Sequence, residues 1–260
     1  MAGDRRADDP VASFRGSPCK ALTPVAGVPM LERVLSALAA SGCIAATTLV
    51  GPSSSALASA PALRQQIEAG RLGWLAPAAS PVQSALAGLD ACANNGPVLV
   101  TTADHALLSA AIVTHFIDQA STLQADFVVA VARLDTVLAG FPGTRRTAIG
   151  LQDGPFCGCN LFAVCTPRGA ELVAFWRRVE QQRKKPWRVI AGALGVTGVL
   201  RYLAGRLTLQ QALERLAEKQ GLRLAAVVLP FAEAAVDVDT LADLALVERT
   251  LAARSGKTET

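Results

Sequence analysis

Short runs of β-branched and apolar residues alternate with amphipathic segments along most of the chain. Residues 43–50, 98–102 and 126–133 have the first pattern, which is typical of buried strands. Residues 30–40 and 80–92 carry apolar side chains at helical spacing. Buried strands that alternate with helices predict an α/β fold, in which a Rossmann-like mixed, mostly parallel sheet has helices on both faces.

The last third of the chain continues this alternation less regularly. Strands are predicted at 158–165 and 222–229, and a helix at 170–182. Thr208 and Gln211 have the spacing of a capping box, which predicts the start of another helix. This part of the sequence therefore extends the same α/β pattern.

The length and composition favour one large domain. The chain has 260 residues, of which 51% are hydrophobic and 18% charged, and this is sufficient for a sizeable core. It contains neither an internal repeat nor a long linker, so we expect a single domain over residues 1–253. Residues 254–260 are polar and lack periodicity, and they are expected to form a flexible tail.

The charge and the cysteine content limit the partners and the compartment. The formal net charge of +4 is compatible with anionic small molecules and too small to indicate a nucleic-acid partner. The six cysteines are scattered without a metal-ligand spacing, and no secretory segment opens the chain, so we expect a cytoplasmic protein with reduced thiols. The longest uncharged apolar run, residues 189–200, is too short to span a bilayer.

A first candidate site lies in the N-terminal segment, residues 2–27. A turn at Gly3, the cation of Arg5 and the cation of Lys20 ahead of a helix could surround a triphosphate. Backbone N–H groups of a glycine turn suit phosphate oxygens, and lysine supplies a point charge. The alternative is a solvated, charged arm.

A second candidate is Asp104, which follows the apolar run 98–102 directly. A carboxylate at the mouth of a buried strand is costly unless it is paired, and a divalent cation is a usual partner. The alternative is a turn aspartate or a helix N-cap. His105 adjoins Asp104 and could line such a site, whereas His115 lies within a predicted helix and is expected to be structural.

A third candidate is the acidic pair Asp237 and Asp239 in the run VDVDTLADL. If this run is a strand, alternation places both carboxylates on the same face. The alternative is a cap for the last helix, a role that Thr240 serves better, with Asp243 three residues further on.

Four motifs in order resemble the MobA-like NTP transferases, a group with a GT-A-like (nucleotide-diphospho-sugar transferase-like) fold. The motifs are KALTPVAGVPMLERVLSALAASG (20–42), PVLVTTADHALL (97–108), GCNLFAV (158–164) and VDVDTLADLALVE (236–248). In the group they correspond to the lysine that follows a glycine-rich loop, the central strand with a metal-binding aspartate, an acceptor-side strand with an asparagine, and a closing acidic element. Together they span most of the chain.

The resemblance implies a nucleotide-binding side. Gly3 and its neighbours would approach the nucleotide, Arg5 and Lys20 would contact its phosphates, and Ser84 in SPVQS (80–84) would stand on the nucleotide side. The reaction implied is transfer of NMP from CTP or GTP to a small phosphorylated acceptor, with release of pyrophosphate. Lys20 and Asp104 would be the catalytic residues.

The resemblance also implies a metal and an acceptor side. Asp104 and Asp239 would hold Mg²⁺, with Asp237 as the substitute, and Asn160 would face the acceptor. An acceptor phosphate is already an anion near neutral pH, so no general base is required. No oligomeric state is predicted.

Two departures from the group stand at the N-terminus. The group begins with a hydrophobic strand, and none precedes Gly3, so we expect either a longer chain upstream or a domain without that strand. Asp4 also replaces the second glycine of the loop.

Two other functions are compatible with these residues. A glycosyltransferase that uses a nucleotide-sugar would also need a metal-binding aspartate after a central strand, but not the Lys20 loop. A non-catalytic nucleotide-binding relative would keep the fold, and the N-terminal departures favour it. The retained Lys20, Asp104 and Asp239 favour the nucleotidyltransferase.

The segment 175–207 combines six basic residues between 177 and 188 with Trp176, Trp187 and the apolar run 189–200. It is predicted to form an amphipathic helix, a solvated loop and a buried helix. The alternative is an acceptor lid or a surface for anionic lipid headgroups, because basic residues beside tryptophan suit a membrane interface.

Overall fold

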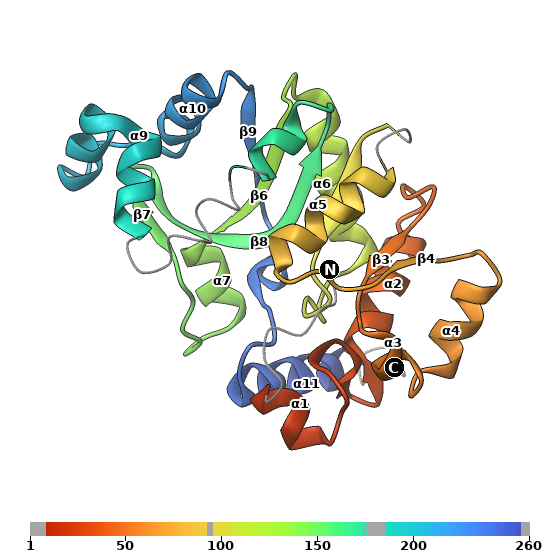
Figure 1. The fold of residues 1–260 in the computed structure, drawn as a ribbon. Coiled ribbons are helices and arrows are strands. Elements are labelled where there is room, and N and C mark those ends of the chain that lie inside the picture. Colours follow the sequence, from red (N-terminus) through yellow and green to blue (C-terminus); the bar gives the residue numbers. More distant parts are fainter. Residues whose placement is uncertain (1–8, 93–95, 174, 176–185, 256–260) are drawn as a thin grey trace. The chain divides into compact units, whose positions relative to one another are not determined.

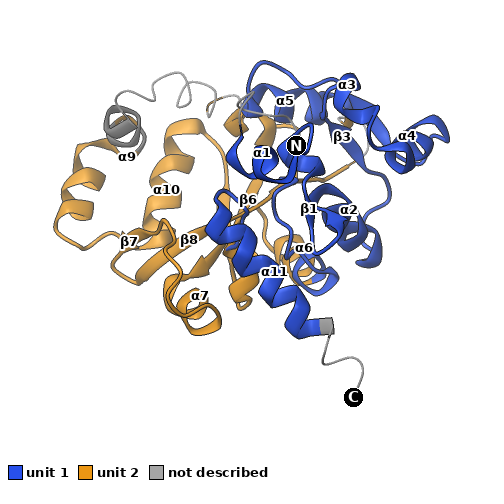
Figure 2. Ribbon diagram, turned by 90° about the horizontal axis from the view of Figure 1, so that it is seen from below, with its two compact units in different colours: residues 1–91, 101–114, 236–260 blue, residues 92–100, 115–235 orange. Residues whose placement is uncertain are grey.

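The computed structural model describes residues 9–92, 96–173, 175 and 186–255. The chain forms two compact units, which Figure 2 distinguishes by colour. Unit 1 comprises residues 1–91, 101–114 and 236–260, and unit 2 comprises residues 92–100 and 115–235. Each unit is thus assembled from segments that are distant in the sequence. Among the described helices, none is long and apolar enough to cross a membrane.

Unit 1 contains a short parallel strand pair and the helices around it. The strands β3 and β4 run parallel, with Leu49 opposite Trp74, and the chain between them forms two helices. The elements are α1 (Pro10–Arg15), η1 (Lys20–Leu22), β1 (Pro24–Val25), β2 (Val28–Pro29), α2 (Met30–Ala40), β3 (Thr48–Val50), α3 (Ser54–Leu57), α4 (Pro61–Glu68), β4 (Gly73–Leu75), most of α5 (Pro81–Cys92), the start of α6 (Ala110–Thr122) and α11 (Leu241–Ser255).

Unit 2 is built on a five-stranded sheet, in which β5, β8, β6 and β9 lie in that order and β7 pairs with β8 (Figure 1). Strand β6 is parallel to β9 and antiparallel to β8. The elements are most of β5 (Val98–Thr101), the rest of α6, β6 (Phe127–Arg133), α7 (Leu134–Gly140), β7 (Ile149–Leu151), β8 (Gly154–Val164), α9 (Pro186–Leu203), α10 (Leu209–Gln220), β9 (Leu224–Leu229) and η2 (Ala232–Ala235).

The predicted mixed α/β fold is confirmed. The pairs β3–β4 and β6–β9, which are joined through helices, are parallel, as expected for crossover connections. Among the strand pairs whose register the structure describes, the hairpins β1–β2 and β7–β8 and the pair β6–β8 are antiparallel. The predicted capping box of Thr208 and Gln211 precedes α10, and the predicted cap Thr240 precedes α11 and exchanges hydrogen bonds with Asp243.

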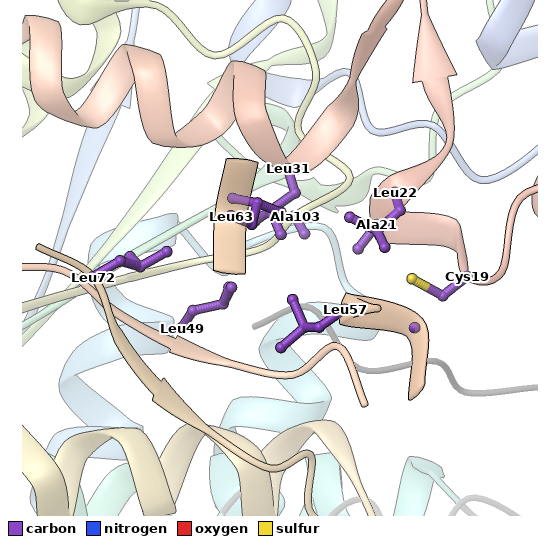
Figure 3. Packing of buried hydrophobic residues seen from close by; sticks show 10 residues of the cluster. Cys19, Ala21, Leu22, Leu31, Leu49, Leu57, Leu63, Leu72 and Ala103 are labelled. Atoms are coloured by element: carbon purple, nitrogen blue, oxygen red, sulfur yellow. The ribbon is translucent and has the colours of Figure 1, made fainter. Parts of the chain in front are cut away.

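The core of unit 1 forms where the predicted apolar faces meet. Figure 3 shows Leu31 of α2, Leu63 of α4 and Leu49 of β3 in one cluster, with Ala103 from the segment after β5. Leu63 is fully buried, and Leu31 is 2% exposed. Ala103 immediately precedes Asp104, so this packing anchors the backbone at the base of the second candidate site.

Three predictions about local structure need correction or restriction. The strand predicted at 43–50 is shorter, because β3 begins only at Thr48. Residues 236–239 do not form a strand, although Val236 and Val238 are fully buried. They follow η2 without regular secondary structure and pair with no strand of the described residues, so the strand argument for Asp237 and Asp239 was wrong. Part of the helix predicted at 170–182 lies outside the described residues.

Candidate functional site

Lys20 begins η1, and its ammonium group binds two aspartates. Nζ lies 2.8 Å from Oδ2 of Asp104 and 2.7 Å from Oδ1 of Asp239. The Lys20 side chain is only 18% exposed. Ala21 and Leu22 next to it belong to the core of unit 1, so the local backbone is anchored by packing (Figure 3). Three residues that are distant in the sequence therefore meet within one unit.

Asp104 lies in a turn between β5 and α6. It is not an N-cap, because Ser109 accepts the hydrogen bond from Ile112 N at the start of α6. Burial alone would raise the pKa of the Asp104 carboxyl, but the adjacent charge and hydrogen bond of Lys20 outweigh it and hold the pKa below its ordinary value. Asp104 is therefore an anion at neutral pH.

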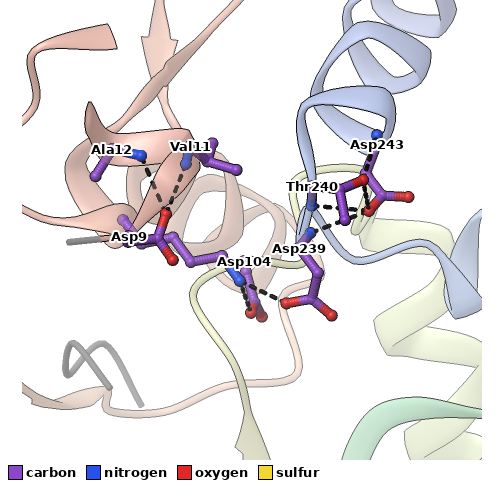
Figure 4. Close-up of polar contacts among 8 residues, drawn as sticks. Asp9, Val11, Ala12, Asp104, Asp239, Thr240 and Asp243 are labelled. Carbon is purple, nitrogen blue, oxygen red and sulfur yellow. Dashed lines mark hydrogen bonds and ion pairs between the residues drawn. The ribbon is translucent and has the colours of Figure 1, made fainter. Parts of the chain in front are cut away.

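Asp239 reaches the same point from the segment ahead of α11. The N–H of Val238 donates to the carbonyl of Asp104 at 3.1 Å, which ties the two aspartate-bearing segments together through their backbones. The Asp239 side chain is 70% exposed, in contrast to 23% for Asp104. Figure 4 shows the two carboxylates converging, while Thr240 and Asp243 form the cap of the helix beside them. The cap is thus separate from the acidic pair.

The charge balance of this cluster is one ammonium against two carboxylates. Burial alone would lower the pKa of Lys20, but the two aspartates outweigh it and raise the pKa above its ordinary value. Lys20 and Asp104 are therefore ionised near neutral pH, and one ammonium between two carboxylates gives the cluster a formal charge of −1. If an anionic ligand binds the ammonium of Lys20 in place of the aspartates, the two carboxylates are left with a negative charge that favours binding of another cation.

The carboxylate oxygens of Asp104 and Asp239 are chemically suitable ligands for Mg²⁺. Carboxylate oxygens are preferred ligands, and magnesium is usually held by one or two of them together with water and substrate phosphates. Oδ1 of Asp104 is buried without a hydrogen-bond partner within the described part of the chain, and a buried anionic oxygen of this kind is costly. Because Lys20 touches both carboxylates, its two partner oxygens cannot be more than about 5.5 Å apart, the sum of the two contacts. No group of three His, Cys, Asp or Glu side chains suited to a metal occurs among the described residues, so the remaining ligands would come from substrate and water.

The other predicted nucleotide residues are placed differently. Gly3 and Arg5 lie outside the described residues. Ser84 belongs to α5 and is 2% exposed, and its Oγ accepts a hydrogen bond from the N–H of Ala78 at 3.0 Å. Ser84 thereby fixes the loop that follows β4, a role that was not predicted from the sequence. In parallel sheets, the loops after the carboxyl ends of strands are the usual place for ligands.

Asn160 lies in unit 2, at an irregularity of β8. The pairing of β6 with β8 shifts between Val129 and Val131, and Asn160 stands in the extra residues with φ of +49°. Asparagine is one of the few side chains that adopt this left-handed conformation at low cost. Bulges of this kind redirect a side chain and are frequent beside functional sites.

Two further features of unit 1 were not predicted. Asp9 caps the start of α1, where its side chain accepts hydrogen bonds from Val11 N and Ala12 N (Figure 4). Gly16, with φ of +62°, caps the end of the helix. Glu248 of α11 binds both the guanidinium of Arg15 and the N–H of Ala26. It therefore braces the segments on either side of Lys20. The sequence signal for α1 was an aspartate followed by proline, with a glycine six residues after the proline.

The histidines take non-exposed positions. His105 is fully buried, so it does not offer an accessible ring beside Asp104. His115 packs edge-on against Phe231 in unit 2, with ring centroids 5.5 Å apart, which agrees with the structural role expected for it.

The basic segment is only partly described. Residues 176–185 lie outside the described residues, and α9 begins at Pro186. The apolar run 189–200 was expected to form a buried helix, but its Val196 and Leu200 are 77% and 60% exposed, and Leu203 just beyond it is 75% exposed. Their spacing of four and three residues places them on one helical face. The expectation of a buried helix is therefore corrected for this part of α9.

A mixed α/β fold with a lysine and two aspartates beyond the end of a strand suits a protein that handles phosphates together with a divalent cation. The family model of the MobA-like NTP transferase domain matches residues 12–229. The chain therefore belongs to the MobA-like NTP transferase family. By family it is a nucleotidyltransferase, with an NTP as one substrate and a small molecule as the acceptor.

Two solved structures are similar to this chain. A hypothetical transferase from Thermus thermophilus shares 31% sequence identity over 94% of this chain and 96% of its own length, with a TM-score of 0.74. The 4-diphosphocytidyl-2C-methyl-D-erythritol synthase from Anaerococcus prevotii shares 14% identity over 88% of this chain and 91% of its own, with a TM-score of 0.54, and this likeness concerns the fold alone. No curated protein matches the chain.

Proposed function

We propose that this protein is a cytoplasmic enzyme that transfers NMP from CTP or GTP to a small phosphorylated acceptor. An oxygen of the acceptor phosphate attacks the α-phosphorus of the NTP in line and forms the new P–O bond. The bond from the α-phosphorus to the bridging oxygen breaks, and pyrophosphate leaves with the electron pair. The observation that carries the proposal is the contact of Lys20 with both Asp104 and Asp239 in a chain of this family.

Lys20 supplies the positive charge for the phosphates. Its pKa is raised by the two aspartates, so the ammonium persists at the pH of the reaction. In the transition state, charge develops on the oxygens around the α-phosphorus and on the leaving pyrophosphate, and a nearby ammonium stabilises it. Loss of Lys20 should therefore lower kcat by ~10²-fold or more, the typical loss for one such electrostatic group.

Asp104 and Asp239 are proposed to hold Mg²⁺. When bound, the ion neutralises charge on the phosphate oxygens. Asp104 keeps its carboxylate ionised and fixed, because its backbone is tied to Val238 and its pKa is lowered. Asp239 is more exposed and able to adjust its position. No proton needs to be removed from an acceptor phosphate, so the chain does not need a general base here.

The remaining predicted residues keep their proposed roles. Gly3 and Arg5 would contact the nucleotide, Ser84 would hold the loop after β4 on the nucleotide side, and Asn160 would face the acceptor. The name of the Anaerococcus prevotii protein refers to a diphosphocytidyl product, but that likeness concerns the fold alone and does not select CTP over GTP.

The test is pyrophosphate release with Mg²⁺ and each of the four NTPs, against a panel of sugar, polyol and pterin phosphates. We expect release with one pair of CTP or GTP and an acceptor, and no release with any NTP alone. Turnover of a nucleotide-sugar without pyrophosphate would instead identify a glycosyltransferase. NTP binding without turnover would identify a non-catalytic relative, and either result would refute the proposed reaction.

A further inference from the structure

We propose that Lys20 fills the metal position between Asp104 and Asp239 until a nucleotide binds, so that metal and nucleotide binding are coupled. The inference rests on the proposed function, because it takes the two aspartates as the magnesium ligands and Lys20 as a phosphate ligand. It adds that these two roles exclude each other in the arrangement observed. The ammonium now binds both carboxylates that the ion would need.

The geometry shows why the two cations compete. Lys20 Nζ lies within 2.8 Å of an oxygen of each carboxylate, and Mg²⁺ binds its ligands at about 2.1 Å. An ion shared by the two carboxylates would therefore stand close to the point where the ammonium now lies. Two cations at such a distance repel strongly in a partly buried site. Mg²⁺ alone should consequently bind only weakly to the nucleotide-free protein.

The structure also indicates which parts can move. Lysine has a flexible four-carbon stem and a charge without a fixed direction, so Lys20 can change partners by rotation of its side chain. Asp239 is 70% exposed and can follow the ion, whereas Asp104 is held by the bond from Val238 N to its carbonyl. The phosphates of an incoming NTP offer the ammonium a new anionic partner. Nucleotide binding thus removes Lys20 from the carboxylates at the moment when the ion is delivered.

The coupling must act in both directions. If the nucleotide strengthens metal binding by some factor, the metal strengthens nucleotide binding by the same factor. Couplings of this kind are typically about 5- to 150-fold. The practical consequence is that the two aspartates stay paired with Lys20 in the absence of substrate and bind the ion together with the NTP.

The experiment measures Mn²⁺ binding without nucleotide by the electron paramagnetic resonance signal of the free ion. Mn²⁺ is the probe because it also accepts carboxylate ligands. We expect Lys20→Met to bind Mn²⁺ at least about 5-fold more tightly than the wild type, because the competing cation is gone. Lys20→Arg keeps a cation and should remain near the wild-type affinity. Lys20→Gln is the second neutral variant, in case Lys20→Met does not fold.

The matched control is Arg64→Met, which removes one positive charge from another ion pair of unit 1, that with Glu68. It should leave Mn²⁺ binding unchanged, and Asp104→Asn should abolish tight binding in the Lys20→Met background. The inference is overturned if the neutral Lys20 variants bind Mn²⁺ no more tightly than the wild type. It is also overturned if Arg64→Met tightens Mn²⁺ binding equally, since the effect would then be one of net charge.

A second measurement distinguishes this inference from the proposed reaction. Adding α,β-methylene CTP or GTP should tighten the binding of Mn²⁺ to the wild type beyond its binding to free nucleotide, and this gain should shrink in Lys20→Met. If the Lys20 variants behave as expected but no NTP and acceptor pair releases pyrophosphate, the proposed reaction fails and the exchange stands. If pyrophosphate is released but the variants bind Mn²⁺ like the wild type, the exchange alone fails.

Discussion

Replacing Asp126 by alanine should destabilise unit 2, because this carboxylate joins three segments of its sheet. Asp126 precedes β6, and its side chain is only 4% exposed. Its oxygens accept hydrogen bonds from the N–H of Arg223 ahead of β9 and from the hydroxyl of Thr166 after β8, each at 2.8 Å. The guanidinium of Arg223 adds a longer contact at 3.4 Å.

The expected loss follows from these contacts. A hydrogen bond to a charged group contributes about 1.5–3 kcal/mol, and two are short here. The Arg223 side chain is 61% exposed, so its ion pair adds little. Because the two short bonds share one carboxylate and are not independent, we expect Asp126→Ala to lower the free energy of unfolding by about 3 kcal/mol.

The pH dependence has a definite sign. The hydrogen bond from the Arg223 N–H is the main cause of a lowered pKa of Asp126 in the folded protein, and burial opposes it. A carboxyl whose pKa is lowered by folding stabilises the protein above its unfolded pKa, about 3.9. The difference between wild type and Asp126→Ala should thus be constant at neutral pH, and it should shrink as the pH falls below about 4 through the lower folded pKa.

The assay is urea unfolding followed by far-ultraviolet circular dichroism at several pH values. The matched control is Asp135→Ala at the other end of β6, where the carboxylate is 62% exposed and pairs with Arg133. This exposed pair is screened by solvent, so Asp135→Ala should lower the free energy of unfolding much less than Asp126→Ala. Equal losses for the two variants, or a loss below about 1 kcal/mol for Asp126→Ala, would refute the reasoning.

Three shorter predictions follow from other contacts. Asn160→Val should lower the free energy of unfolding by about 1–2 kcal/mol because this residue has a positive φ, whereas Asn160→Gly should not. An unchanged KM for the acceptor in the glycine variant would exclude the acceptor role. Ser84→Ala removes the hydrogen-bond partner of the Ala78 N–H and should lower the free energy of unfolding by about 1–2 kcal/mol. It should also raise the KM for the NTP more than it lowers kcat, and a loss confined to kcat would contradict a positioning role. The exposed face of α9 should carry the protein with anionic but not neutral liposomes in flotation, and Leu200→Glu should prevent it; failure of the wild type to float would remove the membrane hypothesis.

The elements that the sequence predicts well are those with local signals. The helix at 30–40, the strand at 126–133 and the capping boxes at Thr208 and Thr240 depend on periodicity and on contacts within a few residues. Helix α1 had comparable signals in Asp9 and Pro10, but they stand in a charged segment without apolar periodicity. The family resemblance then identified Lys20, Asp104 and Asp239 as site residues. Composition alone was also compatible with a solvated arm, a turn and a helix cap at these positions.

What could not be predicted depends on partners that are distant in the sequence. Val236 and Val238 alternate like strand residues, but among the described residues no strand pairs with this segment, and Val238 N donates to the carbonyl of Asp104 instead. The left-handed conformation of Asn160 arises from the register between β8 and β6, which the sequence of β8 does not contain. The direct contact of Lys20 with both carboxylates likewise requires the three segments of unit 1 to be folded together.

The most direct test of the central claim follows both products by ³¹P NMR, with the NTP and acceptor pair found in the panel. The account predicts that pyrophosphate and a new phosphoanhydride signal appear together in equal amounts. It also predicts that Asp104→Asn and Lys20→Met each lower the rate by ~10²-fold or more while the protein stays folded. Full activity in both variants, or release of inorganic phosphate in place of pyrophosphate, would contradict nucleotidyl transfer at this site.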